Sequence, residues 1–154
     1  MTTSDLVIDV KDLNKSFGDK RVVKDFSIQV PRGRITGFLG PNGSGKTTTL
    51  RMLCGLLTPD SGSGTCLGFD IIRESDEIKL RVGYMRQKFS PYEDLTIEEN
   101  LMFMARVHGL DRRQERVKDA LERLGLLERR KQLGGNLSGG WKQRLALAVR
   151  TLHA

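Results

Sequence analysis

The feature that most constrains this chain is a glycine-rich segment between an apolar run and a helical pattern. Residues 40–47 read Gly-Pro-Asn-Gly-Ser-Gly-Lys-Thr, which matches the P-loop pattern G-x-x-x-x-G-K-[ST]. The preceding run, Ile35–Leu39, is apolar without alternation, as expected of a strand covered on both faces. After it, apolar residues recur at helical spacing, at Leu50, Leu53, Cys54 and Leu57. A strand, a glycine turn and a helix in this order predict a nucleoside triphosphate site.

Each residue type in the P-loop has a physical role in phosphate binding. Glycines let backbone N–H groups converge on phosphate oxygens, and the helix N-terminus adds partial positive charge. Lys46 supplies an ammonium for the β- and γ-phosphates, and Thr47 offers a hydroxyl to Mg²⁺. A plain glycine-rich turn would not require Lys-Thr at a helix start. We therefore expect nucleotide contacts from Gly40, Pro41, Asn42, Gly43, Ser44, Gly45, Lys46, Thr47 and Thr48.

Composition indicates a globular chain and excludes some classes. Its 154 residues are 38% hydrophobic and 29% charged, with a net charge of +7, which suits phosphates, nucleic acid or an anionic membrane without choosing among them. The chain lacks the run of about 18 apolar residues that a membrane-spanning helix needs, and it does not begin like a signal peptide. Cys54, Cys66, His108 and His153 lack metal-ligand spacing, so we expect buried thiols and no metal site of this kind.

Hydrophobic periodicity predicts an α/β chain whose second half is helical. Alternation predicts antiparallel strands near residues 6–10 and 26–30, with a polar loop at 14–19 between them. Further short strands are expected at 65–67 and 82–85, separated by a charged helix at 75–80. The helical part begins with a capping box at Thr96 and Glu99 and continues with apolar stripes near 101–108, 117–124 and 145–152.

A second glycine pair distinguishes between P-loop families. Leu137-Ser138-Gly139-Gly140-Trp141 precedes Lys-Gln-Arg at 142–144. Ser138 is an N-cap candidate, and the two glycines leave the first N–H groups of the helix open to an anion. A flexible helix entry would explain the serine but not both glycines before these polar residues. The segment resembles the LSGGQ signature of the ATP-binding subunits of ABC transporters, with Trp141 in place of glutamine.

The resemblance covers nearly the whole chain and assigns roles to further residues. Phe17 corresponds to an aromatic A-loop residue that stacks on adenine, although such an aromatic is often a core residue. Gln87 corresponds to the Q-loop glutamine, which reaches Mg²⁺ or the attacking water and lies where the membrane partner docks. Residues 40–49, 55–62 and 92–96 look like the branch that serves drug and antibiotic exporters. Trp141 cannot reproduce acceptor contacts of a glutamine, because an indole has one donor and no acceptor.

The resemblance also implies a fold and an assembly. The fold is a P-loop NTPase core of the ABC ATPase type, with an antiparallel β part (1–33), a P-loop core (34–87), a helical subdomain (88–137) and a signature helix (138–154). Two such subunits would pair head to tail, each binding ATP and Mg²⁺ between the Lys46 loop of one and the Ser138 loop of the other. Lys46 and Gln87 are the expected catalytic residues, and Thr47 and Gln87 the expected metal ligands. A separate transmembrane permease would hold the pair at the cytoplasmic face of the membrane, as part of an exporter of drugs or other hydrophobic compounds.

Motifs that the family carries after the signature helix do not occur in these 154 residues. They are the Walker B aspartate, the catalytic glutamate, the D-loop and the switch histidine. His153 lies too early to be the switch residue, and Glu98 and Glu99 belong to the capping turn. We therefore expect the N-terminal part of a longer subunit, with the C-terminal part of the core missing. Alone, it should bind nucleotide weakly or not at all, hydrolyse almost none, and be prone to association, because the P-loop strand would expose an edge.

Two alternative functions stay open. A soluble ABC-type ATPase acting on nucleic acid is compatible with the net charge, and a salt-dependent shift of DNA or RNA would support it. However, basic residues are mixed with acids on the helix faces, and the chain between the two motifs is too short for long coiled coils, so no nucleic-acid partner is expected. The other alternative is a short nucleotide-binding fragment without activity, which could inhibit a full-length partner.

Overall fold

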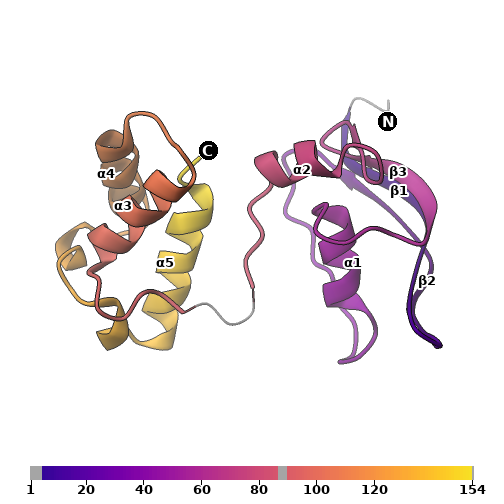
Figure 1. The fold of residues 1–154 in the computed structure, drawn as a ribbon, viewed down its shortest axis with the longest axis horizontal. Helices are drawn as coiled ribbons and strands as arrows, with labels where there is room; N and C mark the ends of the chain where they lie inside the picture. Colours follow the sequence, from indigo (N-terminus) through magenta and orange to yellow (C-terminus); the bar gives the residue numbers. More distant parts are fainter. Residues whose placement is uncertain (1–4, 87–89, 154) are drawn as a thin grey trace. The chain divides into compact units, whose positions relative to one another are not determined.

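The computed structural model describes residues 5–86 and 90–153. The chain divides into two units, Met1–Val82 and Gly83–Ala154. Figure 1 shows a β-sheet with two helices in the first unit and three longer helices, α3, α4 and α5, in the second. In the part of the chain that the structure describes, no helix is long and apolar enough to cross a membrane.

The first unit is built on an antiparallel sheet. Its strands are β1 (Leu6–Phe17), β2 (Lys20–Pro31), β3 (Ser61–Cys66) and β4 (Phe69–Asp70), in the order β2-β1-β3-β4. The predicted antiparallel pair is confirmed, but the loop predicted at 14–19 is wrong, because β1 continues to Phe17 and pairs there with Lys20. The polar residues stay in the ladder because their side chains find partners within it; the Asn14 amide oxygen accepts from the Asp25 N–H at 3.0 Å.

Helices α1 (Lys46–Leu53) and α2 (Ser75–Arg81) complete this unit. The inward side of α1 carries Thr49, Met52 and Leu53, whereas Leu50, predicted on the apolar face, is exposed. The helix therefore packs on a stripe rotated from the predicted one. The core of the unit consists of Val10, Leu13, Val23, Met52, Leu53, Cys66, Ile71 and Ile78.

Two segments predicted as strands, the first of them covered on both faces, do not form strands. Ile35–Leu39 and Val82–Met85 have no strand assignment, and Ile35 and Leu39 are almost fully exposed. A strand that is apolar on both faces requires hydrogen-bonded neighbours and cover on both sides. None of the sheet strands in the described residues pairs with either run, so the ladder that would fix them is not formed. Phe38 still packs edge-on against Phe26, with ring centroids 5.5 Å apart.

The second unit is a helical bundle of α3 (Ile97–Val107), α4 (Arg113–Arg123) and α5 (Gly139–Thr151). Short 3-10 turns, η2 (Leu127–Arg129) and η3 (Gly134–Asn136), connect α4 to α5. The predicted helical stripes form its core, except that His108 is exposed at the end of α3. The core residues are Ile97, Leu101, Ala105, Val117, Ala120, Leu121, Leu126, Leu137, Leu145, Ala148, Val149 and Leu152.

The predicted capping box at the start of α3 is confirmed. The Thr96 hydroxyl accepts from the Glu99 N–H at 3.2 Å, and the Glu99 carboxylate accepts from the Thr96 N–H at 2.8 Å. Hydrogen bonding of its carboxylate by the Thr96 backbone N–H, and by the Thr96 side chain, lowers the pKa of Glu99 below its ordinary value. The cap therefore stabilises α3 above the unfolded pKa of the glutamate and loses this contribution as the pH falls through the lowered pKa.

Gly64 is a point at which β3 tolerates no side chain. Its φ is +142°, and a Cβ there would lie 2.3 Å from the Asp9 carbonyl oxygen on β1. Gly68 also has a positive φ, +81°, but a Cβ there would meet nothing within 4 Å. We expect Gly64→Ala to lower the free energy of unfolding by about 3 kcal/mol and Gly68→Ala by about 1 kcal/mol. Urea denaturation followed by far-UV circular dichroism measures both, and equal losses would contradict the steric explanation.

Candidate nucleotide site

The P-loop begins α1 as predicted. Gly45 is the N-cap residue in the left-handed conformation, with φ +87° and no side-chain cap. A Cβ at this position would lie 2.6 Å from the Val22 carbonyl oxygen, so the loop packs directly against the backbone of β2. Residues 40–44 are exposed, and Ser44 closes the turn by donating its N–H to the Pro41 carbonyl at 3.2 Å. Only glycine at 45 allows this close approach together with this turn.

Lys46 extends over the loop that it follows. Its ammonium donates to the carbonyls of Gly40 and Pro41, the latter at 2.8 Å. An ammonium has three hydrogens, so one donor remains beyond these two bonds. The side chain is therefore positioned beside exposed backbone of the P-loop, where it would meet an anion seated there.

Thr49 is a site residue that sequence reasoning missed. Its side chain is buried, and its hydroxyl donates to the Gly45 carbonyl at 2.9 Å, the same oxygen that accepts from the Thr49 N–H. This bond one turn back secures the junction between loop and helix. The signal was present in the Thr-Thr-Thr run, because a threonine four residues after the N-cap commonly bonds in this way.

The predicted adenine-stacking residue lies on the hairpin that supports the loop. Phe17 ends β1 and its side chain is 49% exposed. The Lys15 ammonium lies 5.6 Å from the centre of its ring. Since Phe17 pairs with Lys20, and β2 contacts Gly45 a few residues later, the hairpin brings Phe17 and the P-loop onto one unit.

The signature turn starts α5 in the second unit. Ser138 is the N-cap residue by position, with extended backbone, but its side chain makes no capping hydrogen bond. The predicted N-cap position is thus confirmed without the predicted cap bond. Ser138, Gly139 and Gly140 are exposed, and a Cβ at either glycine would meet nothing within 4 Å. The open N–H groups of this turn are consequently accessible from solvent.

The two motif helices share an electrostatic property. Among the five α-helices in residues 5–86 and 90–153, α2, α3 and α4 carry Asp or Glu in the first turn, whereas α1 and α5 carry none. An acid in the first turn neutralises the positive end of a helix. Only the helices that follow the P-loop and the signature turn keep this end free of acidic side chains, as an anion site requires.

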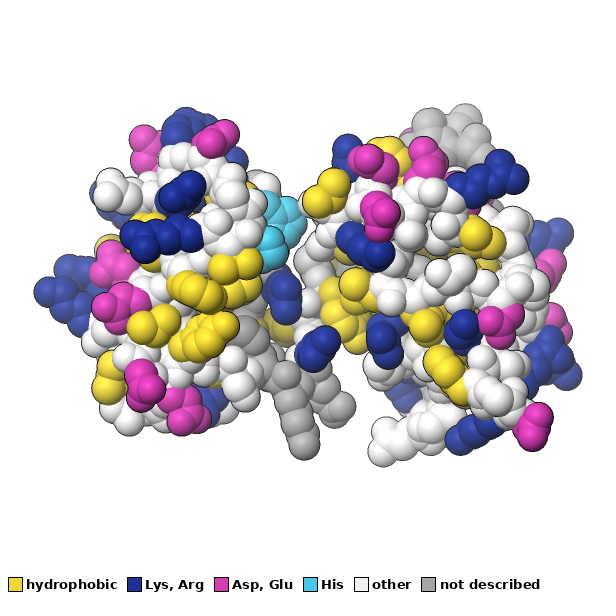
Figure 2. Space-filling view, viewed as in Figure 1, with side chains coloured by type: hydrophobic (Ala, Val, Ile, Leu, Met, Phe, Trp, Pro, Cys, Tyr) yellow, Lys and Arg dark blue, Asp and Glu magenta, His cyan; other side chains and the backbone are white. Residues whose placement is uncertain are grey.

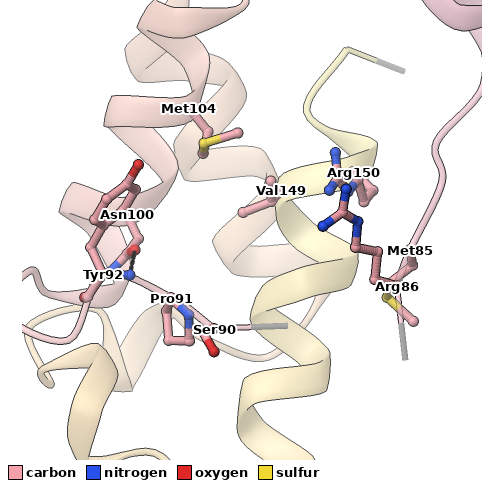
Figure 3. A pocket seen from close by; sticks show the side chains of 9 residues that line it. All are labelled: Met85, Arg86, Ser90, Pro91, Tyr92, Asn100, Met104, Val149 and Arg150. Carbon is pink, nitrogen blue, oxygen red and sulfur yellow. Dashed lines mark hydrogen bonds between the residues drawn. The ribbon is translucent and has the colours of Figure 1, made fainter. Parts of the chain in front are cut away.

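A pocket of about 320 Å³ is lined by residues on both sides of Gln87 in the sequence. Gln87 itself lies outside the described residues, but Met85 and Arg86 precede it and Ser90, Pro91 and Tyr92 follow it in the pocket wall. Asn100, Met104, Val149 and Arg150 complete the lining (Figure 3). The wall holds two guanidinium groups and no carboxylate, and the Nε of Arg150 is buried without a hydrogen-bond partner in the described part of the chain. Sequence reasoning assigned no role to Arg86, Asn100 or Arg150.

Asn100 holds the chain that forms one side of this pocket. It is 2% exposed, and its amide oxygen accepts from the Tyr92 N–H at 2.9 Å, as Figure 3 shows. Its amide group donates to the carbonyls of Tyr92, Leu95 and Thr96 at 3.1, 3.1 and 2.9 Å. One buried side chain therefore satisfies several backbone groups between the Gln87 region and α3.

Comparisons with known proteins agree with this geometry. The model of a family described as ABC transporter matches residues 23–153. The chain belongs to the ABC transporter family. Among relatives of this ABC transporter chain, the probable multidrug ABC transporter ATP-binding protein YbhF of Escherichia coli is 44% identical over 99% of the chain. The bacitracin transport ATP-binding protein BcrA of Bacillus licheniformis is 40% identical over 96% of it. The chain spans 27% of the first relative and 48% of the second.

Solved structures identify the same fold. The cbiO1 protein of Clostridium perfringens, described as part of the ABC transporter complex cbiONQ, superposes with a TM-score of 0.82. It is 26% identical to this ABC transporter chain and is matched over 96% of the chain and 62% of its own length. The predicted fold class, an ABC-type P-loop ATPase, is therefore confirmed, although the described sheet contains only its antiparallel part.

The buried Asn100 amide provides a test of the pocket wall. We expect Asn100→Asp to lower the free energy of unfolding of the second unit by about 3 kcal/mol, because a carboxylate cannot donate to the three carbonyls that the amide serves. Urea denaturation followed by the fluorescence of Trp141, the single tryptophan, reports this unit. Asn136→Asp, at an exposed position, is the control and should change the free energy by less than about 0.5 kcal/mol. Equal effects of both variants would contradict the assignment.

Proposed function

We propose that this chain is the nucleotide-binding part of the ATP-hydrolysing subunit of an ABC exporter for drugs or other hydrophobic compounds. The observation that carries the proposal is the pair of acid-free helix N-termini, each at a glycine motif of the family. The transport roles printed in the names of the relatives favour an exporter of such compounds. Figure 2 shows Lys and Arg interspersed with Asp and Glu on the visible face of each unit, which does not favour a nucleic-acid partner.

The first half of the site would bind the triphosphate of ATP. Backbone groups of Gly40, Pro41, Asn42, Gly43, Ser44 and Gly45, with Lys46, Thr47 and Thr48, surround the phosphates in this proposal. Phe17 would stack on the adenine ring. Thr47 and Gln87 would hold Mg²⁺ together with phosphate oxygens, and the ion would neutralise phosphate charge. Thr47 at the start of α1 is exposed and offers a hydroxyl oxygen, a ligand type that suits Mg²⁺.

The signature turn, residues 138–140, would bind ATP that is held by a partner subunit. Ser138, Gly139 and Gly140 would direct their hydroxyl and open N–H groups to the phosphates of ATP bound at the P-loop of a partner subunit. Binding would thereby close a head-to-tail pair, and hydrolysis would reopen it, so that ATP shifts a two-state equilibrium. Lys46 would stabilise charge on the phosphates and Gln87 would orient the attacking water.

The pocket lined by Arg86, Tyr92 and Arg150 is the proposed docking site of the permease, which would hold the subunit at the cytoplasmic face of the membrane. Its apolar lining from Met85, Met104 and Val149 would cover the side of a short helix. Arg86 and Arg150, which have no carboxylate beside them among the described residues of the wall, would pair with an acidic side chain of that helix. A movement of the Gln87 segment would then reach the membrane partner directly.

Lys46→Ala tests the nucleotide site. We expect at least a tenfold weaker binding of a fluorescent ATP analogue, because the variant removes the mobile cation of the P-loop. Lys24→Ala, which removes an exposed lysine of β2, is the matched control and should bind like the unsubstituted chain. Fluorescence titration at low salt measures both constants, and equal binding by the two variants would refute the assignment.

Arg150→Gln tests the docking pocket. In the intact subunit, we expect at least a tenfold loss of affinity for the permease in lipid nanodiscs, because the uncharged amide cannot replace the guanidinium in a charged pair. Arg106→Gln, at an exposed position of α3 outside the pocket wall, should retain full affinity. Circular dichroism confirms that both variants fold. Unchanged binding of Arg150→Gln to the permease would exclude this pocket.

A further inference from the structure

The signature turn has little side-chain support of its own. Ser138 makes no capping bond, and Gly139 and Gly140 have no side chains to pack. Glycines also favour the unfolded chain over a helix by about 1 kcal/mol each relative to alanine. Trp141 is the first residue of α5 whose side chain packs against the core of the helical bundle. The order of the turn therefore depends on what holds this indole.

Two guanidinium groups contact the indole ring. Arg129 of η2 lies 4.4 Å and Arg144 of α5 lies 4.8 Å from the ring centre. Such contacts stabilise a cation over the negative face of an aromatic ring. Within the described residues, neither arginine forms an ion pair with a carboxylate, so both charges remain unneutralised beside the turn.

Hydrogen bonds connect these two arginines to the end of α4 and to the segment before the signature turn. Arg144 donates to the Leu124 carbonyl at the end of α4 at 3.4 Å. Arg129 donates to the Gln132 side chain at 3.1 Å, and Gln132 donates to the Asn136 carbonyl at 3.3 Å, two residues before Ser138. The Gln132 carbonyl also accepts from the Ile97 N–H at the start of α3 at 3.0 Å. The indole thus lies at the centre of a network that connects all three helices of the bundle.

We propose that Trp141 is a positioning residue of the signature turn, whose indole, held by Arg129 and Arg144, orders the open N–H groups of Gly139 and Gly140 for the phosphates of a nucleotide. The two unpaired guanidinium charges add positive potential at the same place. This role rests on the proposed pairing of two subunits around ATP. It assigns to the indole a structural function that a glutamine at this position could not perform, because an amide offers no aromatic face.

Quenching of the single tryptophan tests the arrangement itself. Because two cations contact the ring, iodide should quench its fluorescence at least threefold more strongly than caesium in the unsubstituted chain. The double variant Arg129→Gln/Arg144→Gln should lose this preference, whereas Arg106→Gln, an exposed charge on α3, should keep it. Equal quenching by both ions in the unsubstituted chain would overturn the proposal.

Nucleotide-driven association of the intact subunit tests the positioning role. With Mg²⁺ and a slowly hydrolysed ATP analogue in place of ATP, Trp141→Ala should require at least tenfold more nucleotide for association in sedimentation velocity. Trp141→Phe keeps an aromatic face and should stay within about threefold of the unsubstituted subunit. Binding of the fluorescent analogue to the P-loop should be unchanged in both variants.

The outcomes separate the two proposals. Association of Trp141→Ala at the nucleotide concentration of the unsubstituted subunit would overturn the positioning role and leave the pairing intact. Failure of the unsubstituted subunit to associate with any nucleotide, despite binding at the P-loop, would refute the pairing and with it this role. If Trp141→Phe associates as weakly as Trp141→Ala, the aromatic face is not what orders the turn. That result would also overturn the proposal.

Discussion

The chemistry proposed for this chain depends on helix N-termini whose positive ends are left free of acidic side chains. Most helices neutralise that end because unpaired N–H groups are costly when nothing accepts from them. Here α2, α3 and α4 each have an acidic residue in the first turn, and α3 adds a complete capping box. By contrast, α1 follows an N-cap glycine, α5 begins with two glycines, and neither helix has an acidic residue in its first turn. These two turns keep their first N–H groups available to phosphate and therefore lack the stabilisation that a side-chain cap or an acidic residue would give.

The surrounding structure compensates for this lack of stabilisation differently in the two units. At the P-loop, compensation comes from the backbone: Gly45 packs on the Val22 carbonyl, and the buried Thr49 hydroxyl bonds the loop to the helix. At the signature turn it comes from a side chain, since Trp141 packs against the helical core and is contacted by two arginines. A rigid backbone contact suits a loop that surrounds its ligand, whereas a packed indole leaves the face of the turn open for another molecule.

Much of the site was predictable from the sequence because its chemistry is local. The P-loop, the N-cap position of Ser138 and the capping box at Thr96 each depend on residues a few positions apart, and the structure places them accordingly. The runs at 35–39 and 82–85 failed as strands because a ladder needs partners elsewhere in the chain, which apolar composition cannot supply. Asn100 and the arginines around Trp141 were missed for a related reason: Asn100 bonds to irregular backbone before α3, and Arg129 reaches the indole from a 3-10 turn, contacts that hydrophobic periodicity does not indicate.

The helical unit links the signature turn to the pocket wall through the start of α3. The start of α3 is joined to the segment before the signature turn, because the Ile97 and Glu98 N–H groups donate to the Gln132 and Arg130 carbonyls at 3.0 and 2.9 Å. The same end of α3 is fixed by Asn100 to Tyr92 in the pocket wall. A displacement of the signature turn by bound phosphate would therefore reach the pocket wall through hydrogen bonds and one helix end. Because these hydrogen bonds join α3 to the segment before the signature turn and to the pocket wall, the bundle is suited to move as a body between the nucleotide and the partner proposed for it.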